Sequence, residues 1–148
     1  MVLWGHKTIA MFDLWTLQHI ASGIAMAFVA GLIVKKIAQR YEINAVSQQI
    51  ILLLMVLAAS LLWECVEHYL ESGAVRGEIG LRISHWFQGV EHWTNRIIGD
   101  TLAVLLGWYL YTKNKWLAIP AKVFSVLWMA LHIVIFSDSM YLHRLMGH

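Results

Sequence analysis

The sequence contains one cysteine and one proline, and only 14% of its residues are charged. The single cysteine, Cys65, excludes an intrachain disulfide. Together with 59% hydrophobic residues and a mean hydropathy of +0.62, the scarcity of charge excludes an ordinary soluble domain of this length. A net charge of +2, without a basic helix or an aromatic RNA-binding pattern, gives no reason to expect a nucleic-acid partner. The composition therefore indicates an integral membrane protein in contact with lipid.

Four apolar segments are each able to form a membrane-spanning helix, at residues 12–37, 46–70, 96–112 and 119–137. A helix needs about 20 mostly apolar residues to cross a hydrocarbon core of about 30 Å. Because the first segment is long enough to span, we expect no cleavable signal peptide. The predicted fold class is all-α, a polytopic membrane four-helix bundle, and residues 1–148 form a single four-span domain.

The only long connection lies between the second and third spans. Gly73, Gly77 and Gly80 are expected to interrupt any continuous helix near its start. Residues 83–93 are amphipathic and rich in tryptophan, which predicts a short helix at the membrane interface. Pro120 is expected in the first turn of the fourth helix, where its missing N–H group would have no partner.

The charged residues predict which face carries the function. An even number of spans places both termini and the long connection at the same membrane face. Basic residues are concentrated in the two short loops at the other face, which favours a cytoplasmic location for those loops. Eight of the nine acidic residues and all eight histidines fall toward the face that carries the termini. Acidic residues contribute little to orientation, so this asymmetry predicts a functional site at the outer face.

Three ionisable side chains end the second span and share one helix face. Glu64, Glu67 and His68 are spaced i, i+3 and i+4. Such groups are costly against lipid and should point into the bundle. We expect a polar layer within about 10 Å of the outer surface. The other spans are expected to add His19, Asp100 and His132 to this layer.

Small residues recur at every fourth position in two spans. Such stripes allow two helices to approach closely. The first span contains His19, Gly23, Ala27 and Gly31, and the third contains Gly99, Ala103 and Gly107. The polar groups on these stripes are therefore expected to face the interior of the bundle.

Carboxylates and imidazoles that project inward from several helices are a recurring way to hold a transition metal. We expect a divalent transition metal here. Its candidate ligands are Glu64, Glu67, His68, His92 and Asp100. A bound metal could activate water for the hydrolysis of a lipid-linked substrate, with Glu64 or Glu67 as the catalytic general base.

The same residues allow other functions. His19 and His132 could be the axial ligands of a b-type haem in an electron-transfer subunit. Without a metal, Glu67 and His68 could relay protons or bind a cationic substrate. The protein could also be a small transporter or a non-catalytic subunit of a membrane complex, in which the polar layer only holds the helices together.

Several of these residues also have purely structural interpretations. Asp13 is well placed to cap the first helix. Arg96 and Asp100, spaced i, i+4, could form an ion pair instead of leaving Asp100 free to bind a metal. His132 could be a packed histidine that bonds to a neighbouring helix.

Three segments carry a resemblance to a known family: Phe12-Asp-Leu-Trp-Thr-Leu-Gln-His-Ile-Ala-Ser-Gly23, Trp63-Glu-Cys-Val-Glu67 and Ile98-Gly-Asp-Thr-Leu-Ala-Val-Leu-Leu-Gly107. They resemble an uncharacterised family of small four-helix bacterial inner-membrane proteins, and the layout is more distantly similar to VanZ-like teicoplanin-resistance proteins. The resemblance implies a multi-pass protein of the bacterial inner membrane, alone, as a homo-oligomer or in a larger complex. The matching positions are His19, Gly23, Glu64, Glu67, Gly99 and Asp100. The sequence departs from the family pattern at Ser22, His68 and Arg96, which stand where the family has His, Asn and Asn.

Overall fold

The computed structural model describes residues 2–146, and most of them are helical. The α-helices are α1 (Trp15–Tyr41), α2 (Ala45–Glu71), α3 (Gly77–Phe87), α4 (Asp100–Lys113), α5 (Ala118–Ala130) and α6 (Tyr141–Leu145). A π-helical turn, Asn95–Gly99, leads directly into α4, and a second one, Leu131–Ile135, continues α5. A short 3₁₀ turn, Lys115–Leu117, precedes α5.

Within residues 2–146, three helices are long and apolar enough to cross a membrane. They are α1, α2 and the helical stretch Lys115–Ile135, with mean hydropathies of 1.8, 2.2 and 1.9. The predicted third span is the shorter helix α4 with its leading π-helical turn, and it does not meet the same criterion. The structure therefore bears out a mostly helical chain with three candidate spans, and the fourth span stays a prediction.

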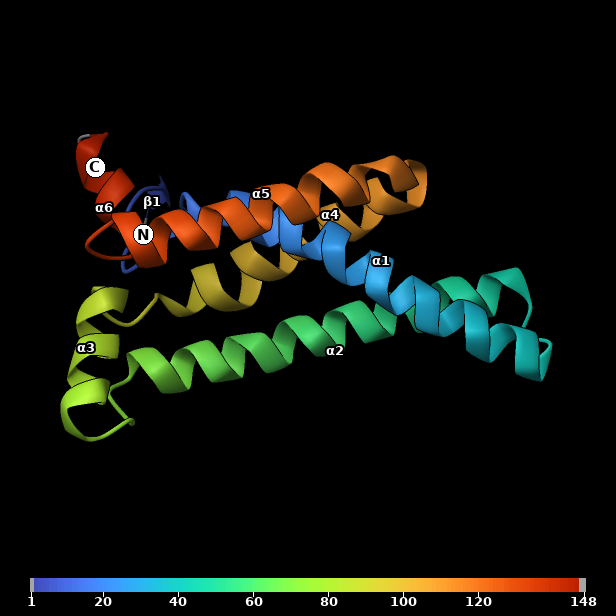
Figure 1. Ribbon diagram of the computed structural model, residues 1–148, viewed down its shortest axis with the longest axis horizontal. Coiled ribbons are helices and arrows are strands. Elements are labelled where there is room, and N and C mark those ends of the chain that lie inside the picture. Colours follow the sequence, from blue (N-terminus) through green and yellow to red (C-terminus); the bar gives the residue numbers. More distant parts are fainter. Residues whose placement is uncertain (1, 147–148) are drawn as a thin grey trace.

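The ends of the long helices are set by polar capping residues. Asn44 precedes α2, and its side-chain oxygen accepts a hydrogen bond from the Ser47 N–H. Asn114 separates α4 from the 3₁₀ turn and accepts a hydrogen bond from the Trp116 N–H in the same way. Pro120 lies in the first turn of α5, as predicted. These tight turns make the helices run back and forth beside one another (Figure 1).

The N-terminal segment corrects the all-α prediction. Val2–Trp4 (β1) and Ala10–Phe12 (β2) form a small parallel two-stranded sheet. The chain termini and α3 lie at one end of the bundle, and the turn between α1 and α2 lies at the other (Figure 1). The termini and the long connection thus lie at the same end of the bundle, and their location at one membrane face stays a prediction.

The interfacial helix begins earlier than predicted. Helix α3 covers Gly77–Phe87 rather than residues 83–93. Gly80 does not break a helix but lies inside α3, where a Cβ would come within 1.8 Å of the Val75 carbonyl oxygen. The helix ends instead at Gln88, whose φ of 58° is in the left-handed region. The chain then has no regular structure from Gly89 to His92 and becomes helical again at Trp93, directly before the π-helical turn.

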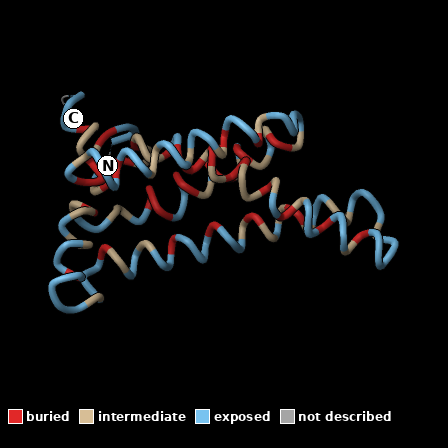
Figure 2. The backbone as a smooth tube through the Cα atoms, in the orientation of Figure 1, coloured by how far each residue is buried: buried red, intermediate tan, exposed pale blue. Residues whose placement is uncertain are grey.

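Helices α1 and α4 make the closest contact in the bundle, along the two stripes of small residues. A Cβ on Gly23 would lie 2.3 Å from the Val104 carbonyl oxygen, and one on Gly107 would lie 2.2 Å from the Ile20 carbonyl oxygen. The predicted close approach of two helices is confirmed at Gly23 and Gly107, whereas Gly99 lies against the Met11 backbone of β2. Buried residues gather where the helices meet, whereas the outward faces are exposed (Figure 2).

The exposed faces are strongly apolar. On α2 they include Leu54, Leu61, Leu62 and Val66, and on the α5 stretch they include Val126, Leu127, Ile133 and Val134. Monomeric soluble proteins rarely expose continuous apolar surfaces of this kind. These faces are consistent with helices that are surrounded by lipid.

Candidate functional site

Three ionisable side chains from three helices meet inside the bundle. His19 comes from α1, Glu64 from α2 and Asp100 from the first turn of α4. One ligand atom from each lies within 4.8 Å of the others, and all three side chains are buried. The His19 ring lies between the two acids, with Nδ1 3.9 Å from Glu64 Oε1 and Nε2 3.5 Å from Asp100 Oδ1. We call these three residues the His–Glu–Asp group.

The carboxylates of this group lack hydrogen-bond partners. Both oxygens of Glu64 and both oxygens of Asp100 are buried, and within residues 2–146 none of the four has a hydrogen-bond partner. Glu64 is 2% exposed and Asp100 is 1% exposed. An unpaired carboxylate in a dry interior is costly unless a proton or a cation neutralises it. The geometry is therefore that of a site whose carboxylates are neutralised by protons or by a bound cation.

The contact between α1 and α4 explains why these residues meet. Gly23 lies against the backbone of Val104, and the two helices run in the same direction from this contact. His19 and Asp100 are each four residues, or about one turn, before the contact on their own helix. The side chains of His19 and Asp100 therefore lie at the same height along the two helices and point toward each other.

A second cluster of charged residues lies next to the His–Glu–Asp group, and we call it the buried ion cluster. Lys7 Nζ lies 3.1 Å from Glu71 Oε2, and Arg96 bonds both to Glu71 and, at 3.0 Å, to Glu91 Oε2. Arg96 also donates to the backbone carbonyl of Glu64, at 3.2 Å. The buried ion cluster thus joins the N-terminal segment, the end of α2 and the start of α4.

Sequence reasoning missed this cluster. Lys7 and Arg96 bond to Glu71 across 64 and 25 residues of sequence, and no local pattern marks such pairs. The alternative that Arg96 pairs with Asp100 is wrong. The π-helical turn between these two residues alters the usual i, i+4 geometry, and the Arg96 guanidinium binds Glu71 and Glu91 instead. Within residues 2–146 Asp100 forms no ion pair with Lys or Arg, and its Oδ1 lies 3.5 Å from His19 Nε2.

Glu91 belongs to the connection between α3 and α4. Burial, reinforced by the nearby Glu67 carboxylate, raises the pKa of Glu91 and outweighs the opposite effect of Lys7 and Arg96. Glu91 is therefore protonated more readily than an exposed glutamate.

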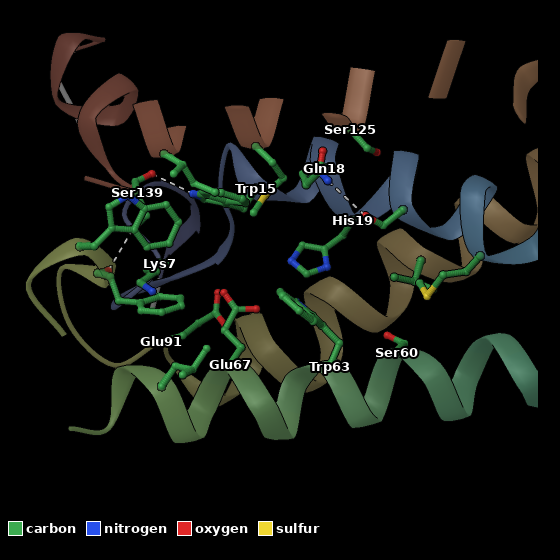
Figure 3. A pocket seen from close by; sticks show the side chains of 18 of the residues that line it. Lys7, Trp15, Gln18, His19, Ser60, Trp63, Glu67, Glu91, Ser125 and Ser139 are labelled. Carbon is green, nitrogen blue, oxygen red and sulfur yellow. Dashed lines mark hydrogen bonds between the residues drawn. The ribbon is translucent and has the colours of Figure 1, made fainter. Parts of the chain in front are cut away.

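A cavity of about 760 Å³ opens beside both sets of charged residues. Its walls come from α1, α2, α3 and α5 and are mostly apolar. Figure 3 shows the His19 ring pointing into the cavity above Trp63, and the carboxylates of Glu67 and Glu91 pointing toward each other near Lys7. The volume is within the range of small-molecule sites, about 300–1,000 Å³. Of the His–Glu–Asp group, only His19 lines the cavity.

Three of the predicted metal ligands lie outside the His–Glu–Asp group. Glu67 is half-buried and lines the cavity, whereas His68 is exposed on the outer side of α2. The face of α2 that points into the bundle carries Glu64, Glu67 and Glu71, which are spaced i, i+3 and i+7. His68, at position i+4, lies on the adjacent face, which is exposed. The prediction of His68 as a metal ligand is corrected for this reason.

His92 is also removed from the predicted ligand set. Its Nδ1 accepts a hydrogen bond from the Thr94 N–H at 3.3 Å and lies 2.7 Å from the Thr94 hydroxyl. Its backbone carbonyl accepts hydrogen bonds from Asn95 and Arg96. His92 therefore acts as a cap where the chain enters the π-helical turn.

His132 does not join the His–Glu–Asp group either. Its ring packs against Trp15 and Trp128, with centroid separations of 4.8 and 4.7 Å, and against Phe136 at 5.0 Å. Its Nδ1 lies 2.9 Å from the Trp128 carbonyl oxygen. These contacts are those of a packed histidine. His19 and His132 thus have separate surroundings.

Asp13 has the capping role that was predicted for it. Its Oδ1 accepts hydrogen bonds from the backbone N–H groups of Trp15 and Thr16. Its Oδ2 accepts a hydrogen bond from the Asn95 side chain at 3.2 Å. Asp13 therefore fixes the start of α1 next to the π-helical turn that precedes α4.

No family model matches the chain, and neither the curated proteins nor the solved structures include a match. The resemblance to small bacterial inner-membrane proteins stays a prediction.

Proposed function

We propose that this protein is a four-span protein of the bacterial inner membrane that binds a divalent transition metal at its outer face, through His19, Glu64 and Asp100, and hydrolyses a lipid-linked substrate. The observation that carries the proposal is the absence of hydrogen-bond partners for four buried carboxylate oxygens around one imidazole, within residues 2–146. Two carboxylates balance the charge of one divalent cation.

The donor set suits a catalytic metal. One imidazole nitrogen and two carboxylates are ligands that zinc, iron and manganese accept. Catalytic sites of this type commonly use three protein ligands and leave a position open for water or substrate. His19 is the member of the group that reaches the cavity wall. Glu64 does not line the cavity, so we assign it as a ligand rather than as the general base.

The fourth span is supported by the continuity of the helix before and through α4. The π-helical turn of 5 residues leads without a break into the 14 residues of α4. At the α-helical rise this stretch is about 28 Å long, close to the thickness of a hydrocarbon core. The two short loops with their concentrated basic residues then lie in the cytoplasm.

In such a site the metal and the side chains of the protein would have different chemical roles. A bound metal supplies a Lewis acid and lowers the pKa of a coordinated water. Glu67 lies on the cavity wall and can accept a proton from water there, which makes it the catalytic base of the proposal. The apolar remainder of the cavity excludes water and accepts the lipid portion of the substrate.

The metal content of the purified protein tests the first step. We expect about one transition-metal ion per chain after purification in detergent and reconstitution with zinc, manganese or iron. Glu64→Gln and Asp100→Asn keep the side-chain shape but remove a charged ligand, and each is expected to lower the metal content at least about tenfold. Glu78→Gln is the matched control, because Glu78 is exposed on α3. Wild-type protein that takes up no metal, or ligand variants that keep it, would overturn the proposal.

A further inference from the structure

The polar end of the cavity has more acid than base. Three carboxylates, Glu67, Glu71 and Glu91, gather there with the cations Lys7 and Arg96. Lys7 is bonded to Glu71, and Arg96 is shared between Glu71 and Glu91. Among the residues that the structure describes, Glu67 has no ion-pair partner. Glu67 therefore faces the cavity without an ion pair of its own.

Arg82, the basic residue of α3 at the cavity, does not neutralise these carboxylates. Arg82 lines the cavity from α3 but is highly exposed and bonded to Glu78 at 2.7 Å. The neighbouring His–Glu–Asp group adds two more carboxylates on the same side. A phosphate head group placed here would meet carboxylates, whereas a positive head group would find complementary charge.

Aromatic rings surround the acidic end. Trp63 comes from α2, Trp15 from α1 and Trp86 from α3, and all three line the cavity (Figure 3). Trp15 and Trp86 meet edge to face at a centroid distance of 6.0 Å. Walls of tryptophan together with a carboxylate are the usual way in which proteins recognise ammonium groups.

The protein already holds one ammonium group in this way. Lys7 Nζ lies 5.0 Å from the centroid of the Phe87 ring and 3.1 Å from Glu71 Oε2. Lys7 is only 3% exposed, so protein groups rather than water surround its ammonium group. Glu67 and the tryptophans place a carboxylate beside aromatic rings in the same way, and they line a cavity that an external ligand can enter.

The rest of the cavity suits an apolar chain with a polar linkage. Met26, Met129 and Ile133 are among its apolar lining residues. Two buried polar atoms on its walls, Gln18 Oε1 and Ser60 Oγ, have no hydrogen-bond partner in the described part of the chain. Gln18 is 8% exposed and Ser60 is 2% exposed, so neither is well hydrated. They offer hydrogen bonds to a hydroxyl or amide group along a lipid-like ligand.

We propose that the cavity binds a cationic amphiphile, with an ammonium head group against Glu67 and the tryptophan rings and an apolar chain along Met26 and Met129. This inference does not rest on the proposed function. An ammonium group paired with Glu67 would block the use of this carboxylate as a general base, so the bound amphiphile is a ligand of the cavity and not the hydrolysed substrate. The binding itself requires the cavity and Glu67, and not the metal.

Photo-crosslinking in nanodiscs of neutral lipid tests the inference. The probe is an alkyltrimethylammonium with a diazirine in its chain, and the competitors are a trimethylammonium, a phosphate and an alcohol of the same chain length. We expect labelling on the cavity side of α2 and α5, and competition by the ammonium compound at least about tenfold stronger than by the other two. Equal competition by all three, stronger competition by the phosphate, or labelling spread over the lipid-facing surfaces would overturn the inference.

Substitution locates the head group. Glu67→Gln is expected to remove the preference for ammonium while labelling by the apolar chain persists, and Glu78→Gln is expected to change nothing. An unchanged preference in Glu67→Gln would contradict the assignment. The competition series on the wild-type protein is decisive even if a variant folds poorly.

Repeating the series after chelation separates the two proposals. Ammonium preference without any metal binding would support this inference and contradict the metal site, whereas metal binding without ammonium preference would do the reverse.

Discussion

Gly23 of α1 lies against Val104 of α4 so closely that a Cβ on the glycine would come within 2.3 Å of the valine carbonyl oxygen. This backbone contact sets the level at which His19 and Asp100 meet, because each is one turn before it. The stripe of small residues therefore positions two of the three residues of the candidate metal site.

Replacing Gly23 by alanine is expected to force α1 and α4 apart. Overpacking of this kind typically costs about 1–3 kcal/mol, and here it also separates His19 from Asp100. We expect a lower melting temperature and a lower metal content. Ala58→Val is a suitable control, since Ala58 is on the exposed face of α2. An alanine variant with wild-type stability and metal content would show that the close contact does not position the site.

Breaking the buried ion cluster is expected to destabilise the fold. Glu71→Gln leaves Lys7 and Arg96 buried with less negative charge, and removal of one partner of a buried pair commonly costs about 3–5 kcal/mol. Thermal unfolding in detergent measures the effect. Glu78→Gln removes an exposed partner of Arg82 and should cost less than about 1 kcal/mol. Similar losses in both variants would contradict the assigned importance of the buried cluster.

His132 gives a test of its structural role against a haem. His132→Phe keeps an aromatic ring among Trp15, Trp128 and Phe136 but loses the hydrogen bond to the Trp128 carbonyl oxygen. We expect a loss of about 1 kcal/mol in stability and no change in metal content. A haem absorption band in the wild-type protein that disappears in this variant would contradict this expectation and favour the electron-transfer alternative.

Asp138 gives a prediction for the pH dependence of stability. Burial alone would raise the pKa of Asp138, but hydrogen bonds from Arg144, Ser137 and the Met140 N–H lower it below its ordinary value of 3.8. Because the folded pKa is the lower one, the stabilisation is present above about pH 3.8 and is lost as the pH falls through the folded value.

The comparison of wild type with Asp138→Asn isolates this contribution. The variant is expected to be less stable by about 1–3 kcal/mol at pH 7, and the difference should shrink below pH 3.8. Unfolding curves at several pH values give the measurement. A difference that grows on acidification would mean that the hydrogen bonds do not favour the ionised form.

The long helices and part of the site could be predicted from the sequence because both depend on the cost of placing polar groups in lipid. Hydropathy shows which segments are apolar, and ionisable groups inside such segments must avoid lipid, so His19, Glu64 and Asp100 were all expected to point inward. Helical periodicity could not place His68, because neighbouring positions i+3 and i+4 differ in burial only once the partner helices are known.

The features that the sequence did not predict depend on long-range contacts. Lys7 and Glu71 are 64 residues apart, and nothing local marks either as buried. The strands Val2–Trp4 and Ala10–Phe12 have three residues each, too few for a clear alternation of apolar and polar side chains. The π-helical turn before Asp100 likewise has no simple local signal, although it determines that Arg96 turns away from Asp100.

X-ray absorption spectroscopy of the metal-reconstituted protein tests the central claim most directly. We predict a first coordination shell of nitrogen and oxygen only, with the outer-shell scattering of one imidazole, and loss of that imidazole signal in His19→Ala. A shell that contains sulfur, or an imidazole signal that persists without His19, would contradict the assignment of His19, Glu64 and Asp100 as the metal site.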